Sequence, residues 1–158
     1  MAAANTKSSD LVTQLMLRVF QVNGRLLAQG DALVAPLSLN SARWQMLGAI
    51  ALAEVPLTVP QIAESMGVTR QGAQKQVNRL VTEGLLLQQD NPNHLRSPLY
   101  SLSKAGDSLY QQATALNAVW AARLGKGISR EALETTLNTL DELLDLLQAP
   151  VPTQGEKR

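Results

Sequence analysis

Apolar residues recur at three- and four-residue steps along most of the 158-residue chain, the spacing of one buried helix face. The first half of this pattern predicts two helices. One begins at a polar cap within residues 8–10 and stops at Gly30, because glycine often ends a helix. The next begins at Asn40 or Ser41 and ends before Pro56. The positions of this second helix expected to face inward are Trp44, Leu47 and Ala51.

Two shorter helices are predicted in the middle of the chain. A short strand over Leu57–Val59 leads into the first, where Thr58 and Gln61 have the spacing of a capping box. Gly67 ends this helix, and Thr69 caps the second almost at once. Two helices joined by such a tight glycine turn form a helix-turn-helix.

A β-hairpin is predicted next. Residues 85–89 and 99–102 have strand composition, and the Asn-Pro-Asn sequence at 91–93 between them is typical of a turn. Pro98 lies where a proline is tolerated, at the start of an edge strand. The hairpin would form a wing beside the helix-turn-helix.

Two leucine-rich helices are predicted after the hairpin. Ser103 caps the first, residues 125–127 (Gly-Lys-Gly) interrupt the pattern, and Ser129 caps the second. In the last helix the leucines are spaced by four and three residues in turn, as in a helix-packing seam. The polar sequence that follows predicts a disordered tail.

The helix capped by Thr69 has an apolar side made of Ala73, Val77, Leu80 and Val81. Burial of that side turns the polar residues outward, and these are Arg70, Gln71, Gln74, Lys75, Asn78 and Arg79. Arginine and lysine can donate to guanine, glutamine and asparagine can pair with adenine, and a helix N-terminus with its threonine suits a phosphate. The segment has no acidic residue. It therefore favours duplex DNA recognition over the alternative of an ordinary solvated face.

The hairpin turn carries one cation, Arg96, between Leu95 and Ser97. An arginine at such a tip can enter the narrow minor groove, where the negative potential is strong; the alternative is an ordinary surface arginine. His94 is the only histidine of the chain, and a lone loop histidine is more often a surface residue than a ligand.

Composition excludes several classes of protein. The chain has no cysteine, so thiolate metal sites, disulfides and thiol chemistry are absent. Aromatic residues make up 3% of it, too few for a platform that stacks single-stranded bases. No phosphate loop or nucleophile-base pair is visible, so we expect neither an enzyme nor a bound cofactor or metal. The first ten residues have no apolar signal region, and we expect a cytoplasmic protein.

The leucine-rich helices at the two ends of the chain need a partner for their apolar area. Two identical chains could bury these helices together and present two recognition helices to a palindrome, with half-sites about 34 Å apart. The alternative is packing within one chain. The leucines expected at the dimer interface are Leu11, Leu15, Leu133, Leu137, Leu140 and Leu144.

The stretch LTVPQIAESMGVTRQGAQKQVNRLVTEGLL, followed by NPNHLRSPLYSLSKAG, resembles the MarR family of bacterial regulators, and the resemblance extends over about residues 11–147. It implies that the helix after Thr69 enters the major groove with Arg70, Gln71, Gln74 and Lys75 at contacting positions, and that Arg96 enters the minor groove. It also implies a dimer formed by the terminal helices. The chain departs from the family at His94, where an acidic residue is usual, and at Leu95, where a second cation is common.

Many members of that family bind a small, often aromatic, effector that weakens DNA binding. The sequence does not identify such a ligand or its site, although Trp44, Tyr110 and Arg18 could line a cleft of that kind. Core packing is the alternative role for the two aromatic residues.

These inferences predict a mainly α fold with a small β-hairpin wing, in which a winged helix-turn-helix DNA-binding lobe is joined to a helical dimerisation lobe. A single domain is expected over residues 9–148, with the winged helix over about 38–104 and dimerisation helices over about 9–30 and 104–148. Residues 1–8 are expected to be mobile and 149–158 disordered. The expected function is a homodimeric repressor released by an effector; a winged-helix module that binds another protein, without DNA binding, is the alternative.

Overall fold

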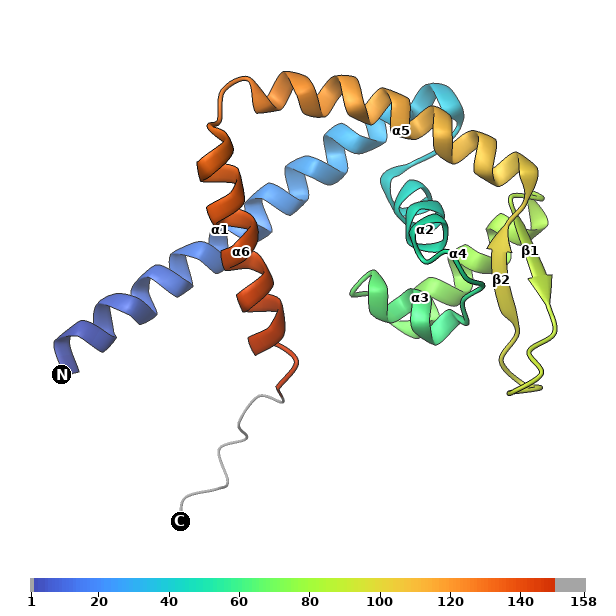
Figure 1. Ribbon diagram of the computed structural model, residues 1–158, viewed down its shortest axis with the longest axis horizontal. Helices are drawn as coiled ribbons and strands as arrows, with labels where there is room; N and C mark the ends of the chain where they lie inside the picture. The colour runs from blue at the N-terminus through green and yellow to red at the C-terminus, as the bar shows by residue number, and fades with distance from the viewer. Residues whose placement is uncertain (1, 150–158) are drawn as a thin grey trace, which may run out of the picture. The chain divides into compact units, whose positions relative to one another are not determined.

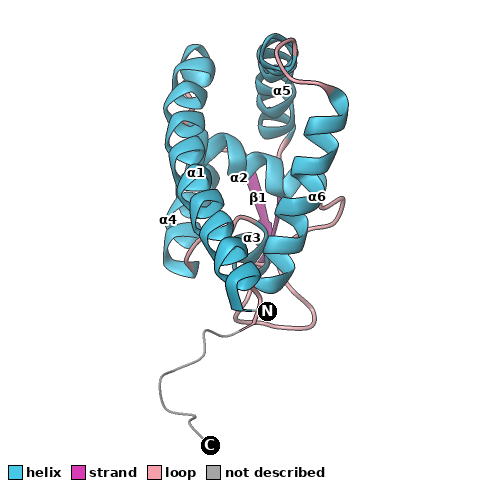
Figure 2. Ribbon diagram, turned by 90° about the vertical axis from the view of Figure 1, so that its left-hand side faces the viewer, coloured by secondary structure: helices cyan, strands magenta, loops and turns pink. Residues whose placement is uncertain are grey.

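The computed structural model describes the backbone of residues 2–149 and the side chains of residues 8–149. The elements run in the order α1 (Ala2–Val34), η1 (Ala35–Leu37), α2 (Ser41–Leu52), α3 (Val59–Ser65), α4 (Arg70–Thr82), β1 (Leu86–Gln89), β2 (Leu99–Leu102), α5 (Lys104–Gly125) and α6 (Arg130–Leu146). Helix predominates over strand, as Figure 2 shows. Apart from Ala149, the tail expected to be disordered lies outside the described residues.

Contacts divide the chain into two compact units, residues up to Asn117 and residues from Ala118 onward. The first unit holds α1 to α4, the hairpin and the first part of α5. Figure 1 shows α2, α3 and α4 gathered beside the β1–β2 hairpin within it. None of the helices among the described residues is both long enough and apolar enough to cross a membrane.

Helix α1 is longer at both ends than its sequence predicts. It begins at Ala2, so the expected cap within residues 8–10 is wrong, and it continues through Gly30 to Val34. Gly30 is needed for close packing and does not end the helix: a Cβ there would lie 2.6 Å from the Ser41 hydroxyl oxygen. That hydroxyl donates to the Leu27 carbonyl at 2.8 Å, and the Asp31 carboxylate accepts the Ser41 backbone N–H at 2.6 Å. The end of α1 is thereby fastened to the start of α2.

The core lies where α2 and α4 pack together. Met46, Leu47 and Ile50 of α2 are buried with Val77 and Leu80 of α4, and burial of so much apolar surface is the main force that holds the two helices in contact. The Asn40 side chain caps α2 by accepting the Arg43 N–H at 2.9 Å, as its sequence predicts. Of the expected inward residues, Leu47 is fully buried, whereas Trp44 and Ala51 are half-buried.

The caps predicted for α3 and α4 are confirmed. Thr58 and Gln61 form a capping box at the start of α3, and the Thr69 hydroxyl accepts the Gly72 N–H at 3.1 Å at the start of α4. Gly67 has a φ of +62°, a conformation that glycine adopts without the clash of a Cβ atom. This left-handed residue lets α4 begin almost immediately after α3 and so completes the helix-turn-helix.

The hairpin pairs β1 with β2 in antiparallel register, from Leu86 opposite Leu102 to Gln89 opposite Leu99. The short strand expected over Leu57–Val59 is wrong except at its first residue. Leu57 makes an isolated bridge to Tyr100, and Val59 already begins α3 because Pro60 fits the first turn of a helix.

A serine and a glycine join α5 to the base of the hairpin. The Ser103 hydroxyl donates to the Gly84 carbonyl at 2.7 Å and accepts the Gly106 N–H at 3.0 Å, which caps α5 as its sequence predicts. Gly106 is buried against the backbone of Leu85. This close contact sets the direction in which the wing leaves the helices.

In the second unit, the predicted cap of α6 is confirmed, since the Ser129 hydroxyl accepts the Ala132 N–H at 3.2 Å. Several of its leucines, among them Leu137, Leu144 and Leu147, are more than half exposed within one chain.

Candidate nucleic-acid interface

Helix α4 has one buried face and one exposed face. Ala73, Val77 and Leu80 are fully buried against the core. Seven of the residues predicted to contact DNA lie on the exposed part of the helix or at its cap: Thr69, Arg70, Gln71, Gln74, Lys75, Asn78 and Arg79. The sequence pattern therefore predicts correctly that these side chains are exposed to solvent. Their role as DNA contacts stays a prediction.

Hydrogen bonding divides this set of residues. The Gln74 side-chain amide donates to Asn78 Oδ1 at 2.8 Å, so each of these amides already has a partner. Arg79 donates through Nε to Glu83 at 3.0 Å. In the described part of the chain, the side chains of Arg70 and Lys75 form no hydrogen bond or ion pair. These two cations can therefore bind an external anion without first breaking a bond within the protein.

The wing loop is braced from within. Asn91 is buried, donates through Nδ2 to the Ser97 carbonyl at 2.9 Å and accepts the Asn93 N–H at 3.0 Å. The backbone N–H of Ser97 donates to the His94 carbonyl at 2.9 Å, which closes a turn around Leu95 and Arg96. These bonds order the backbone of the tip that carries both residues.

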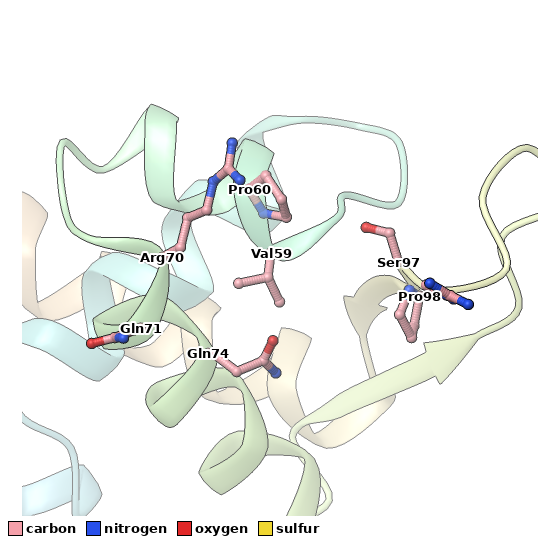
Figure 3. Close-up of a pocket in the computed structure, with 8 residues that line it drawn as sticks. Val59, Pro60, Arg70, Gln71, Gln74, Ser97 and Pro98 are labelled. Atoms are coloured by element: carbon pink, nitrogen blue, oxygen red, sulfur yellow. The ribbon is translucent and has the colours of Figure 1, made fainter.

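Two depressions separate the wing from the start of α4. The first, of about 350 Å³, is lined by Arg70, Gln71 and Gln74 of α4, by Val59 and Pro60, and by Arg96, Ser97 and Pro98 of the wing. Figure 3 shows Val59 on its floor and Gln74 facing Pro98, while Gln71 points away from the wing. The second, of about 680 Å³, is also lined by Arg70 and Ser97, and by His94 of the wing loop. The fold thus brings Arg70 and Arg96, which are distant in sequence, to one concave surface.

Arg43 is a residue of this unit that the sequence reading did not select. It is 8% exposed, donates through Nη1 to the Ser38 carbonyl at 2.7 Å, and forms an ion pair through Nη2 with Glu83 at the end of α4. Burial lowers the pKa of Arg43 below its ordinary value, and repulsion from Arg79 lowers it further. A signal was available, because Arg43 lies three and four residues before the core residues Met46 and Leu47.

The three residues that the sequence suggests for an effector cleft lie away from the depressions beside α4. Trp44 and Tyr110 are half-buried and pack against the core, and the Tyr110 ring lies against Gly48. The Arg18 guanidinium donates to Gln21 at 2.8 Å on the exposed surface of α1. Neither depression beside α4 is lined by any of the three.

A helix-turn-helix followed by a β-hairpin, with a cationic concave surface between them, defines a winged-helix protein. The sequence model of the MarR family matches residues 37–97, which extend from the end of η1 to the wing loop. Uncharacterized proteins of Mycobacterium tuberculosis and Mycobacterium bovis are 36% identical over 144 residues, covering 91% of this chain and 99% of each relative. The chain belongs to the MarR family.

Solved structures have the same fold. A MarR variant from E. coli complexed with operator DNA aligns with a TM-score of 0.75 at 22% identity, over 84% of this chain and 95% of that one. A MarR family transcriptional regulator from Rhodococcus sp. RHA1 aligns with a TM-score of 0.74 at 20% identity, over 84% and 94%. CouR from Rhodococcus jostii RHA1, bound to p-coumaroyl-CoA, aligns with a TM-score of 0.70 at 19% identity, over 89% and 95%. This chain therefore has the fold of MarR family transcription regulators.

Proposed function

We propose that this protein is a homodimeric transcriptional regulator that binds palindromic double-stranded DNA in the cytoplasm. The observation that carries the proposal is the common surface of Arg70 and Arg96, two exposed cations on different elements that line one depression. A phosphate backbone that follows this surface would bring α4 to the major groove and the wing tip to the adjacent minor groove. The E. coli MarR variant, which has the same fold and is complexed with operator DNA, supports DNA binding by this chain.

In this proposal the bases are contacted by Arg70, Gln71, Gln74 and Lys75. Thr69 and the first N–H groups of α4 bind a phosphate, and Arg96 occupies the minor groove. Asn78 and Arg79 each use one polar atom in an internal bond, to Gln74 and Glu83, which restrains these side chains and leaves their remaining polar atoms for DNA. We therefore expect smaller losses of affinity from Asn78→Ala and Arg79→Ala than from Arg70→Ala.

The proposed dimer uses the leucines of α1 and α6. Within one chain Leu11 is 65% exposed, and Leu133, Leu137 and Leu144 are exposed too, whereas Leu15 and Leu140 are half-buried. Leaving this much leucine in water is unfavourable, and a second copy of the chain would bury it. In this arrangement residues 38–104 bind DNA, and helices within 9–30 and 104–148 form the dimer.

The direction of regulation that we propose is repression relieved by a small aromatic effector. A dimer seated on a promoter palindrome excludes other proteins by occupancy alone. CouR bound to p-coumaroyl-CoA supports an effector of this chemical type. A direct check is to titrate p-coumarate and p-coumaroyl-CoA into the protein–duplex complex and to measure release of the duplex by fluorescence anisotropy.

The decisive experiment is selection of bound duplexes from a random pool by the purified protein. A two-fold palindrome is the expected product, and an Arg70→Ala, Lys75→Ala double variant should lose it. An Arg123→Ala, Lys126→Ala double variant is the matched control, since it removes two cations that lie outside α4 and the wing. No enrichment at low salt would reject DNA recognition in favour of a protein-binding module.

Salt dependence gives a second test. If six or more phosphates are neutralised, affinity should fall by about 10³-fold or more between 50 and 200 mM salt. Arg96→Ala should weaken binding and reduce any preference for A·T pairs beside the half-sites. A flat salt response would contradict docking of α4 on the phosphate backbone.

A further inference from the structure

Arg43 is the only charged side chain that is buried in the part of the chain that the structure describes. Its guanidinium joins three elements: the turn after η1, through the Ser38 carbonyl; α2, which carries it; and the end of α4, through Glu83. Its Nε atom is buried with no hydrogen-bond partner. Three core residues of α2 and three of α4 already hold the two helices together by apolar packing, so this cation is not needed simply to fill space.

Glu83 binds a second guanidinium, that of Arg79, so both oxygens of its carboxylate have a cationic partner. Arg79 donates to Oε1 of the carboxylate while Arg43 binds Oε2. Glu83 is the C-cap of α4, where the negative end of the helix dipole disfavours a carboxylate, so the two guanidinium groups offset that cost. An ion pair between a buried guanidinium and a partly exposed carboxylate contributes little net stability compared with apolar residues of similar size. Its clear effect is on geometry, because charged hydrogen bonds are directional and apolar contacts are not.

We propose that Arg43 is a positioning residue for DNA recognition, which holds the end of α4 at Glu83 so that Arg70, Gln71 and Gln74 keep the orientation needed to read bases. This role rests on the proposed function. Helix α4 has 13 residues and is therefore about 20 Å long. A tilt of about ten degrees at the Glu83 end would move the Arg70 end by about 3 Å. Base hydrogen bonds tolerate only a few tenths of an ångström, whereas flexible contacts to phosphates adapt.

The test compares affinity for the selected palindrome with affinity for a scrambled duplex of equal length. Arg43→Met removes the pair, Arg43→Lys keeps the charge without the planar fork, and Glu83→Gln keeps the shape of the acceptor. Lys126→Met is the control, because it removes one exposed cation from the loop between α5 and α6, outside α4, the wing and the helices proposed for the dimer. Full-length proteins are used at a temperature at which circular dichroism shows each to be fully folded.

We expect the ratio of the two affinities to fall about tenfold or more in Arg43→Met and Arg43→Lys, the equivalent of one good base contact. Affinity for the scrambled duplex should change less than about threefold, and Lys126→Met should match the unaltered protein in both measurements. If Arg43→Met does not fold, Arg43→Lys and Glu83→Gln decide the question. An unchanged ratio in folded variants, with only a lower melting temperature, would overturn the positioning role and leave the proposed function intact. An unaltered protein with no preference for any duplex would reject both.

Discussion

Replacement of Gly106 by alanine tests how tightly the wing is joined to α5. The backbone of Gly106 is ordinary helix, so the change introduces no conformational strain of its own. The new Cβ would lie 2.0 Å from the Leu85 carbonyl oxygen and 3.0 Å from the carbonyl carbon. Ordinary contact begins at 3.4 Å, so the Leu85 carbonyl oxygen and α5 must separate by about 1.4 Å. Because the obstacle is backbone, rotation of a side chain cannot relieve the clash.

The expected cost follows from three contributions. Overpacking costs about 1–3 kcal/mol, and weakening of the hydrogen bond from Ser103 N–H to the Leu85 carbonyl adds about 1 kcal/mol. The higher helix propensity of alanine returns up to about 1 kcal/mol. The net loss is about 1–4 kcal/mol, and in a chain of this length the melting temperature should fall by about 2–16 °C.

The assay is thermal unfolding followed by circular dichroism at one fixed protein concentration, since association with a second chain would raise the midpoint. Gly24→Ala is the control, because a Cβ at this position in α1 meets no atom within 4 Å. It should leave the midpoint unchanged or raise it slightly. A Gly106→Ala midpoint within about 2 °C of the unaltered protein would refute the close contact between α5 and Leu85.

Three further predictions concern single interactions. Thr69→Ala removes the hydroxyl that accepts the Gly72 N–H and should cost about 1 kcal/mol in urea unfolding, whereas Thr69→Ser should cost less. Hydrogen bonds from Ser41 lower the pKa of Asp31, so this carboxylate contributes stability above its unfolded pKa that is lost as the pH falls through the folded pKa. Asp31→Asn should therefore be less stable than the unaltered protein at neutral pH, and the gap between the two urea midpoints should close as the pH falls below the unfolded pKa of Asp31; a constant gap would contradict this reasoning. Leu95→Arg should tighten duplex binding and steepen the log–log salt dependence by about 0.9 if the new cation meets one phosphate, and an unchanged slope would mean that the wing tip does not approach the backbone.

The elements that the sequence predicts well are those with a local chemical signal. Three helices are capped by side chains that bond to residues three positions later, and these caps are Asn40, Thr69 and Ser129. The beginning of each helix can therefore be predicted from a few adjacent residues. The strand at 99–102 matched the structure completely, because Pro98 marks its beginning and Ser103 its end. The exposed face of α4 was predictable for the same reason, since its periodicity is a local property.

The features that were missed depend on contacts between distant segments. Gly30 was interpreted as a stop, but its role is to admit Ser41, which no local pattern reveals. The Arg79–Glu83 pair is an exception, because it joins residues only four positions apart on one helix, and the expected contact of Arg79 with DNA stays a prediction. The pairing of Arg43 with Glu83 spans forty positions, so only the unusual placement of a charge on a core-facing stripe hinted at it.

The bracing of the wing loop has a kinetic consequence. Fixing the backbone of a loop costs about 1–2 kcal/mol per residue in entropy, and loops that become ordered only on binding subtract that cost from affinity. Here Asn91 and the turn bonded between His94 and Ser97 order the tip in the free protein. Association with a duplex would then need no folding step in the wing, and its rate would be governed by diffusion and electrostatic attraction.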